Sequence, residues 1–489
     1  MLLRTLFLCS PILFCASGAF GQSIRVVDAA NGPGTDFTSL PAAVLAAVSG
    51  DVFLVRPGSY APFWVSGKDL HIFGAGPDVC FIEGPTVGPS ITEDYVRIEN
   101  VPAGKTFDLT GFTIRATGMD LNYITALGTT TPLDVEPAIA ALAVRGATGT
   151  TVVADVETEP SASAPPFPNV PGGLLVDGAD VHSHRCRWTG GVLYSLGNAR
   201  IFGTPGATVR NGAVLVATNC SFEGPFIAVS VSYGSLNCIA GTGLIVRQSG
   251  AALHGCSLSG GSASATIGGL PAFSSAIAVG GNALRAKSGA LVRISASSTD
   301  SIIGGGATAA VTGNYVWTGT ASGPGFAIRT DDGGAVVVHG DPTMISPPQN
   351  PGYPTILNLG SATLGQPELP RLSTSGVAVN GGEWDATQSV TLSLTCPLPN
   401  APFVLLLDIY PGFSTPLPGL QLGELLLSAV GGFIVGGELD ATGAFSVSVV
   451  PILLAPGAAN VPLHLQAAVA DFGAGHWRLS NAETRIFRN

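Results

Sequence analysis

The middle of the chain repeats, and this repeat constrains the fold more than any other feature of the sequence. Cys238 follows Cys220 by 18 residues, Cys256 follows Cys238 by another 18, and Cys186 precedes Cys220 by 34. Gly-Ala pairs recur around these cysteines and open short apolar stretches; they begin at residues 178, 212, 250, 289 and 334. Such a period is typical of a solenoid, in which each coil buries its apolar row against the next.

The composition indicates that the coils consist of strands. Glycine (66) and proline (36) are frequent, charged residues are only 11%, and lysine occurs at positions 68, 105 and 287 alone. Long runs of Ala, Glu, Lys and Leu, which favour helices, are missing, whereas Val, Ile, Thr and Ser favour strands. We therefore expect an all-β chain whose repeat forms a β-helix.

Alignment of the coils on the Gly-Ala pairs predicts which side chains face inward. One inward column holds apolar residues only, namely Val181, Leu215, Leu253 and Val292. Strand alternation turns the next column outward, with His182, Val216, His254 and Arg293. Coils of about 18 residues would place the cysteines Cys186, Cys220 and Cys256 two coils apart, too far to bridge. We expect buried thiols, with a disulfide through Cys238 as the alternative.

A short helix is expected before the first coil. Ser39 can cap it, Pro41 suits its first turn, and Gly50 can end it. Residues 40, 44, 45 and 48 are apolar and share one helical face. Such a helix would cover the open end of the stack, where backbone groups are otherwise unpaired.

The stretch 36–60, DFTSLPAAVLAAVSGDVFLVRPGSY, resembles the opening of pectin-lyase-like right-handed parallel β-helix proteins. The stretch 107–115, FDLTGFTIR, is similar to a coil of the same superfamily. The resemblance covers residues 24–345 and implies a right-handed parallel β-helix of about a dozen coils. It also implies carbohydrate ligands, often uronic-acid polymers, bound along an outer face of the helix.

The chain divides into four segments. Residues 1–21 have the features of a secretory signal peptide: Arg4, an apolar stretch over 6–14, and a small-x-small site at 19–21. Lipid attachment is the less favoured alternative, because Leu8 and Phe14 precede the two cysteines there. The β-helix is expected over 22–345, a stiff proline-rich linker over 346–371, and a small β-sandwich over 372–489. The end of the sandwich resembles a C-terminal module of exported bacterial proteins.

Charge and hydropathy restrict the partners. The chain has 21 basic and 32 acidic residues, a net charge of −11, and no basic stripe, which argues against nucleic acid as a partner. No segment after the signal peptide offers about 18 uninterrupted apolar residues, so no membrane span is expected. We predict a monomer that is secreted or lies at the cell surface.

Two patterns of catalytic residues are relevant to a chain of this kind. Lyases of the resembled class use a Ca²⁺-binding carboxylate cluster with a basic residue as proton acceptor, and hydrolases use paired aspartates; neither motif is present in family form. Asp331 and Asp332, followed by His339, are the candidate catalytic residues. The alternative is a solvated turn, since Gly333 and Gly334 follow directly. No cofactor is predicted, and Ca²⁺ enters only if the chain is a lyase.

A binding surface for an anionic sugar is the other candidate site. Its residues are His182, Arg185, Arg187, His254 and Arg293, because arginine can hold carboxylates bidentately; a row of solvated side chains is the alternative. His182 and His184 could share a face and bind a metal, but no third ligand is evident, so no metal is predicted. Tyr60, Trp64 and Trp317 could stack on sugar rings, or pack at loops.

Three functions follow from these patterns. The first is an exported β-helix protein that binds a polysaccharide or a cell-surface glycan without catalysis. The second is a divergent polysaccharide lyase or glycoside hydrolase acting on uronic-acid-containing glycans. The third is a structural or adhesion protein that meets no sugar. Low charge and the missing acid pairs favour the first.

Overall fold

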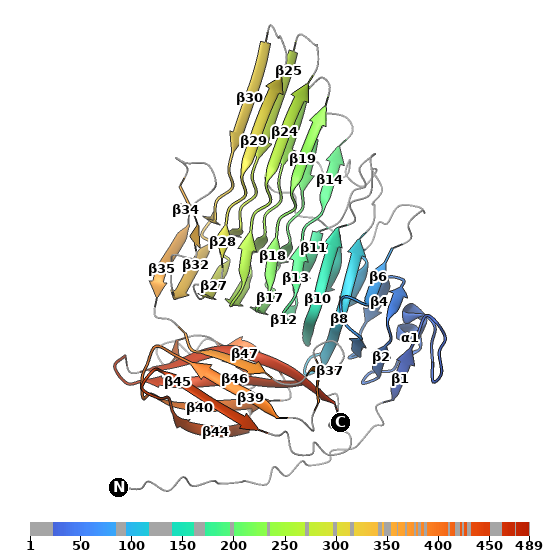
Figure 1. Cartoon of the computed structure of the whole chain (residues 1–489), viewed down its shortest axis with the longest axis vertical. Coiled ribbons are helices and arrows are strands. Elements are labelled where there is room, and N and C mark those ends of the chain that lie inside the picture. The colour runs from blue at the N-terminus through green and yellow to red at the C-terminus, as the bar shows by residue number, and fades with distance from the viewer. Residues whose placement is uncertain are drawn as a thin grey trace.

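Figure 1 presents a computed structural model of the chain. The structure describes residues 23–488 except 85–93, 117–138, 161–171, 196–199, 232–234, 269–272, 297–300, 313–316, 341–344, 347–353, 359, 367–368, 376–377, 380–382, 386–388, 409–410, 416–420, 423–424, 428–431, 450–461 and 475. The predicted signal peptide over 1–21 lies outside the described residues.

Two long parallel sheets form the body of the molecule (Figure 1). Sheet A has 18 strands. Its first strands in successive coils are β1 (Ile24–Val27), β2 (Val52–Val55), β5 (His71–Gly74), β8 (Thr106–Ala116), β10 (Thr150–Pro160), β12 (Asp180–His184), β17 (Val214–Thr218), β22 (Gly250–His254), β27 (Leu291–Ala296), β32 (Ala335–Gly340) and β35 (Ser361–Gln366). After a bend, seven short strands continue it: β3 (Gly58–Tyr60), β6 (Cys80–Glu83), β13 (Arg187–Thr189), β18 (Ser221–Glu223), β23 (Ser257–Ser259), β28 (Ile302–Ile303) and β33 (Ile345–Ser346).

Sheet B closes each coil on the other side. Its nine strands are β4 (Phe63–Ser66), β7 (Val96–Glu99), β9 (Ala140–Arg145), β11 (Gly172–Asp177), β16 (Ala207–Arg210), β21 (Leu244–Arg247), β26 (Leu284–Lys287), β31 (Ile328–Thr330) and β34 (Ile356–Asn358). The inward side chains of both sheets form one continuous apolar core, which contains Trp188, Phe112 and Phe222. The predicted all-β parallel β-helix is confirmed.

The N-terminal helix forms where the sequence predicted it. Helix α1 (Leu40–Ala46) begins after Ser39, whose side chain accepts a hydrogen bond from the amide of Ala42. The helix packs against β4 and buries Leu40 and Val44, but Leu45 and Val48 of the predicted apolar face are exposed, so that face is only half correct. The helix ends at Ala47, before the predicted Gly50, which adopts a φ of 89° in the turn that leads into β2.

In the middle of the chain the coil is about twice as long as the cysteine spacing suggested, so that prediction is wrong there, although the coil from Val52 to His71 has 19 residues. Val181 pairs with Leu215, Leu215 with Ala251, and Ala251 with Val292, which puts equivalent residues 34, 36 and 41 positions apart. Cys238 lies on a different sheet and in a separate apolar core from Cys220. The 18-residue spacing therefore does not measure a coil.

The alignment on Gly-Ala pairs fails in one coil. Leu253 pairs with Ala217, two positions beyond its predicted partner Leu215. The turn between Arg247 and Gly250 has two residues, whereas the turn after Arg210 has three, so Gly250 belongs to the strand. A shift of two residues preserves the orientation of every side chain, and Leu253 is still fully buried.

The cysteines are buried, as expected, although the predicted reason was wrong. All six described cysteines are free. Cys186 and Cys220 lie in neighbouring coils, and the Cys186 amide donates to Cys220 Sγ at 3.4 Å. Their interior position favours the role of small apolar side chains.

Four coils send an extension out of the body, which we call the protrusion (Figure 1). One of its sheets contains β14 (Val192–Ser195), β15 (Arg200–Gly203), β20 (Ser235–Ile239), β25 (Phe273–Val279) and β30 (Trp317–Gly323). The other contains β19 (Ile227–Val231), β24 (Ala263–Gly268) and β29 (Ala307–Thr312). Small side chains from both sheets, such as Ala265 and Ala276, form a separate core between them. The sequence analysis did not predict this extension.

The body extends further than the predicted boundary at 345. Strands β34 and β35 lie within the stretch predicted as a linker, and they pair with β31 and β32. The two described prolines of this stretch, Pro354 and Pro370, lie outside the strands, so they do not interrupt the pairing of the last coil.

A C-terminal domain of two packed sheets follows. The smaller sheet contains β36 (Arg371–Ser375), β39 (Val390–Thr395) and β45 (Ala444–Val449). The larger contains β37 (Ala378–Val379), β38 (Glu383–Asp385), β40 (Pro402–Asp408), β42 (Gln421–Leu422), β44 (Gly432–Glu438), β46 (Pro462–Asp471) and β47 (His476–Arg488). Leu392 of the smaller sheet and Leu405 of the larger share one core, which makes the domain a β-sandwich. Within the described residues, no helix is both long and apolar enough to span a membrane.

Candidate functional site

The outer face of sheet B carries the largest group of paired charges that we find. Because side chains alternate along a strand, Val144 and Val176 point into the core while the residues on either side point outward. The last position of successive strands forms a column that we call the charged row: Glu99, Arg145, Asp177, Arg210, Arg247 and Lys287, followed by Asp331 directly after β31.

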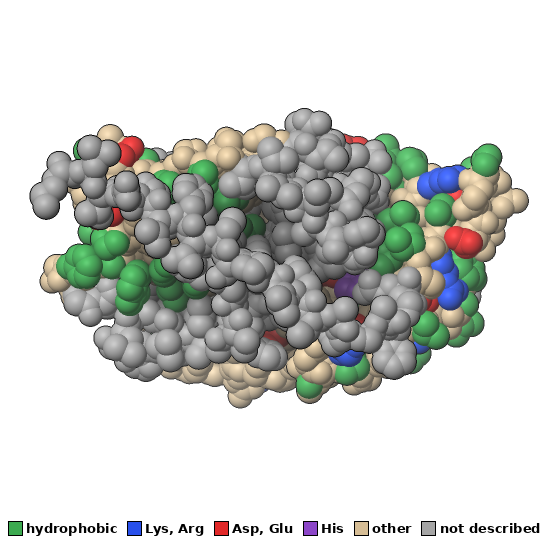
Figure 2. Space-filling model, turned by 90° about the horizontal axis from the view of Figure 1, so that it is seen from below, with side chains coloured by type: hydrophobic (Ala, Val, Ile, Leu, Met, Phe, Trp, Pro, Cys, Tyr) green, Lys and Arg blue, Asp and Glu red, His purple; other side chains and the backbone are tan. Residues whose placement is uncertain are grey.

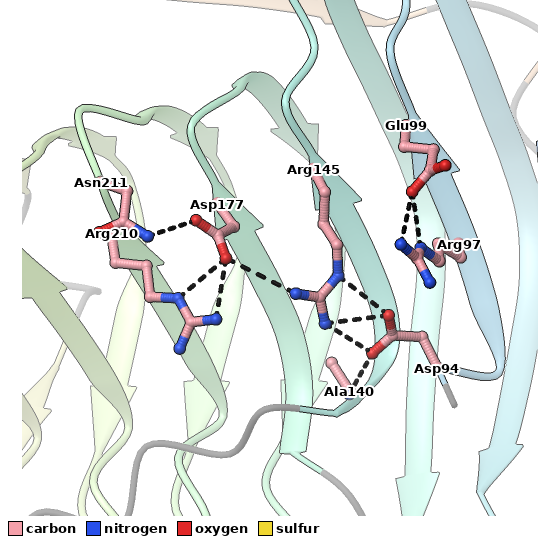
Figure 3. Close-up of polar contacts among 8 residues, drawn as sticks. All are labelled: Asp94, Arg97, Glu99, Ala140, Arg145, Asp177, Arg210 and Asn211. Carbon is pink, nitrogen blue, oxygen red and sulfur yellow. Dashed lines mark hydrogen bonds and ion pairs between the residues drawn. The ribbon is translucent and has the colours of Figure 1, made fainter. Parts of the chain in front are cut away.

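Ion pairs connect the coils along the charged row (Figure 3). Arg145 reaches Asp94, just before β7, with contacts of 3.0 and 3.1 Å, and approaches Asp177 at 3.6 Å. Asp177 also accepts hydrogen bonds from Arg210 at 2.8 and 3.1 Å. One arginine thus joins two carboxylates, and one carboxylate joins two arginines, across neighbouring coils.

The two carboxylates that contact Arg145, Asp94 and Asp177, have pKa values shifted in opposite directions. Burial raises the pKa of Asp94 above its usual value, and its contacts with Arg145 only partly offset that effect. Burial also acts on Asp177, but hydrogen bonds from Arg210 and Asn211 outweigh it and lower the pKa. Asp177 is therefore a firmly ionised partner of the arginines.

Cations exceed carboxylates on this face. Seven basic side chains lie on it: Arg97, Arg145, Arg210, Arg247, Arg285, Lys287 and Arg329. Four acidic side chains accompany them, namely Asp94, Glu99, Asp177 and Asp331. Arg247 is exposed, whereas Arg285 and Lys287 are buried. The face is positive in a chain whose net charge is −11.

An aromatic side chain begins the neighbouring outward column. Trp64 on β4 is 56% exposed, and the guanidinium of Arg97 lies 5.0 Å from the centre of its ring. Arg97 is held in turn by Glu99 at 2.7 Å. The tryptophan face and the arginine together form a platform suited to a sugar ring that carries a carboxylate.

The arginines of the predicted sugar surface lie on sheet A instead. Arg185, with a φ of 52° at the bend, makes a two-point contact with Asp155 at 2.6 and 2.8 Å. Arg187 makes a similar contact with Glu223 at 3.0 and 3.2 Å. Both guanidinium groups are therefore engaged with carboxylates of the chain.

The histidines predicted for the same surface point outward but are buried. His182 is 3% exposed and His254 is 7% exposed. They do not share a column: His182 aligns with Val216, Ala252 and Arg293, whereas His254 aligns with His184 and His339 through Thr218 and Ser295. The prediction that His182, His254 and Arg293 share one column is therefore wrong for His254, because the shorter turn before Gly250 changes which residues align. The structure does not gather the five residues into one open surface.

The candidate catalytic residues occupy two different sheets. Asp331 follows β31 of sheet B and contacts Arg285 at 2.7 Å and Arg329 at 3.0 Å. Burial opposes ionisation there, but the hydrogen bond and charge of Arg285 outweigh it and lower the pKa of Asp331. Asp332 is exposed in the turn with a φ of 47°. His339 is buried on β32 of sheet A. A lowered pKa suits a carboxylate that holds arginines, not a proton donor at neutral pH.

Metal ligands do not converge in the described part of the chain. No group of three or more His, Cys, Asp or Glu residues there has the arrangement to hold a metal ion. The rings of His182 and His184 lie 6.5 Å apart and are tilted by 55°.

Sequence reasoning missed the charged row although a signal was present. Arg145 and Asp177 each immediately precede a turn glycine, and Arg210, Lys287 and Asp331 each stand two places before one. The glycines were recognised as repeating, but the charged residue before each was not read as part of the repeat. Because the row contains both acidic and basic residues, a search for one repeated residue type does not find it.

Comparison with known proteins finds only distant similarities. No protein-family model and no curated protein matches the chain. Among solved structures, a pectin methylesterase from Erwinia chrysanthemi matches at 14% identity and a TM-score of 0.26, over 55% of this chain and 80% of that one. The A-module of mannuronan C-5 epimerase AlgE4 from Azotobacter vinelandii matches at 14% identity and a TM-score of 0.22, over 67% and 90%. A family 28 exopolygalacturonase from Yersinia enterocolitica matches at 8% identity and a TM-score of 0.19, over 71% and 79%. The parallel sheets of this chain define its fold, and its own residues are the basis for the function proposed below.

Proposed function

We propose that this protein is exported and binds an acidic polysaccharide, without cleaving it, along the outer face of sheet B. The observation that carries the proposal is the charged row, which offers a cation in most coils at the spacing of parallel strands, about 4.8 Å. A linear polymer laid along the helix axis would meet basic side chains in three successive coils, at Arg210, Arg247 and Lys287. Export is proposed from the signal-peptide features of residues 1–21.

Charge on this face supports an anionic ligand. Its basic side chains outnumber its acidic ones, and Arg247 is exposed at the centre of three successive basic positions with Arg210 and Lys287. A carboxylate of the polymer can approach the exposed Arg247, and guanidinium groups recognise carboxylates with two hydrogen bonds. Trp64 and Arg97 would hold a sugar ring at the end nearest α1.

The engagement of the carboxylates supports binding without cleavage. A hydrolase needs one carboxyl that donates a proton and one that attacks or activates water. Asp177 and Asp331 are instead held by arginines that lower their pKa values.

The test measures binding and products in one experiment. The protein is titrated with polygalacturonate and, separately, with neutral dextran, at low and at high salt. We expect binding to polygalacturonate alone, weakened by salt because exposed charges are screened. New ultraviolet absorbance from unsaturated uronates in the presence of Ca²⁺ would indicate a lyase, and new reducing ends without it a hydrolase; either product contradicts the proposal. Failure to bind any acidic glycan would favour a structural role.

Two matched variants locate the site. Arg247→Glu reverses an exposed charge on sheet B and should weaken binding about tenfold. Arg187→Glu reverses a charge on sheet A, where the Arg187 side chain is 57% exposed, and should leave affinity unchanged. The opposite result would place the ligand on sheet A.

A further inference from the structure

Four of the seven histidines of the chain gather on the outer side of sheet A, which we call the histidine face: His182, His184, His254 and His339. Each is at least nine-tenths buried although it points away from the core of the coils. Neither ring nitrogen of His254 has a hydrogen-bond partner. Buried imidazoles of this kind exist only in the neutral form while the face stays covered.

The C-terminal domain contacts this face. Strand β47 packs against β17, which lies between the strands of His182 and His254. The guanidinium of Arg371 on β36 comes within 3.3 Å of the Cβ position of Gly255, next to His254. Figure 1 shows the domain, in orange and red, beneath the coils that contain β12 and β17.

We propose that the histidine face is an acid-sensitive contact that holds the C-terminal domain against the β-helix and releases it when His182 and His254 take up protons. Protonated His254 would place a cation next to Gly255, the residue that Arg371 of the domain approaches, in a setting with little water to screen the repulsion. Release exposes both rings to water, where the charged form is stable. The two domains then stay folded and separate.

The contact is expected to weaken at low pH because a charged imidazole is costly to bury. Burial lowers the pKa of His182 and of His254 from the ordinary 6.5 to about 4, and His339 adds to the effect at His254. The released state therefore binds more protons between pH 6.5 and 4, so the contact weakens as pH falls through that range. At pH 5, each histidine shifts the equilibrium toward release by about 30-fold.

Other charged groups on the face modify this balance. Asp180, on the same side of β12 as His182, has a pKa raised by burial to about 6, so its protonation at pH 5 opposes release by up to about tenfold. Arg293 lies in the column of His182, and like Arg371 it repels a new cation. His71 is paired with Asp108, which raises its pKa against the effect of burial. On β47, Arg478 is held by Asp471 at 2.6 Å.

The test follows the whole chain from pH 7.5 to 4.5. Small-angle scattering should show a compact particle above pH 6 and a larger radius of gyration below pH 5, reversibly, while circular dichroism keeps its strand signal. Hydrogen exchange should rise on β17 and β47 and stay low on β16. An unchanged radius across the range would overturn the proposal, and so would an increase that coincides with loss of the strand signal.

Variants identify the proton-binding groups. The near-isosteric pair His182→Gln with His254→Gln should move the opening midpoint down by at least one pH unit, and Arg371→Gln should also lower it. His254→Gln alone should produce about half the shift and serves if the double variant does not fold. His71→Gln is the matched control, a histidine of the same sheet that should not move the midpoint. A double variant that opens at the wild-type pH contradicts the proposal.

Discussion

The body and the protrusion stack the same coils in two different ways. In the body, large side chains such as Trp188 and Phe222 fill the space between sheets, and ion pairs cross the outer faces from coil to coil. In the protrusion, the core consists mainly of alanines, and the two sheets meet the body through a neck of glycines. No charged residue occurs in three stretches that enter it, between Glu223 and Arg247, between Arg247 and Arg285, and between Asp300 and Arg329.

The neck explains why the protrusion needs glycine. The amide of Gly281 donates to Gly261 at 2.8 Å, and that of Gly305 donates to Gly281 at 2.9 Å. A Cβ on Gly281 would lie 1.8 Å from the carbonyl oxygen of Gly241, far inside van der Waals contact. Backbone packs directly on backbone here, whereas in the body side chains keep the sheets apart. The comparison teaches that one solenoid can contain both a thick and a thin packing, selected by side-chain volume.

The same contrast appears at the surface. Figure 2, seen from the side of the C-terminal domain, shows the described Lys and Arg side chains gathered mainly at the end that carries the first coils. Charged residues of the body are also paired with a neighbour in another coil, as for Arg56 with Asp28 and Arg115 with Glu83.

The largest expected effect is at the neck. Gly281→Val should abolish the packing of the protrusion, because the added side chain meets backbone atoms that cannot move aside. We expect a loss of at least about 4 kcal/mol, measured by urea unfolding, with fast hydrogen exchange on β25. Gly250→Ala is the control: no atom lies within 4 Å of its Cβ position, so stability should be unchanged or slightly higher. Equal effects would remove the distinction between neck and body.

A cavity in the body should rank second. Trp188→Ala removes a fully buried indole that donates from Nε1 to Ser183 Oγ at 3.1 Å, and we expect a cost of about 3–5 kcal/mol. Ala276→Gly in the protrusion removes one methyl and should cost about 1 kcal/mol. Urea unfolding of the two variants measures both losses of stability. A larger loss for Ala276→Gly than for Trp188→Ala would contradict the view that each side chain contributes less in the core of the protrusion than in that of the body.

Breaking the charged row should have a smaller effect. Asp177→Asn leaves Arg145 and Arg210 with one carboxylate fewer in a half-buried setting, at a cost of about 1–2 kcal/mol. The pKa of Asp177 is lowered in the folded chain, so its contribution is present near neutral pH and is lost as pH falls below about 4. Asp332→Asn, an exposed turn position that tolerates asparagine, should be neutral. The measurement is thermal unfolding at pH 7 and at pH 3.5.

The smallest effect concerns salt. Raising sodium chloride from about 0.05 to 0.5 M should speed hydrogen exchange slightly at β11 and β16, since half-exposed ion pairs are screened. Exchange on β24 and β25 should not respond, because their stretches of the sequence are uncharged. A uniform response across both regions would mean that the row does not stabilise the body.

The sequence predicted local structure well where the signal was local. Ser39 and Pro41 set the start of α1, and the alternation of apolar residues fixed which side chains of β12, β17 and β27 face inward. The sequence did not predict the coil length, because Cys220 and Cys238 belong to different cores and do not occupy equivalent positions in successive coils. The candidate sugar surface failed to form one face because a turn shorter by one residue changed which residues align.

The amino-acid pattern alone therefore determined an all-β solenoid with buried apolar columns, since period and side-chain alternation are properties of a few neighbouring residues. Only the tertiary structure decided which charges meet, that Arg145 would join Asp94 to Asp177, and that β47 would contact β17, the strand between those of His182 and His254. These contacts join residues 30 or more positions apart, and their partners depend on turn lengths that shift the register by whole residues.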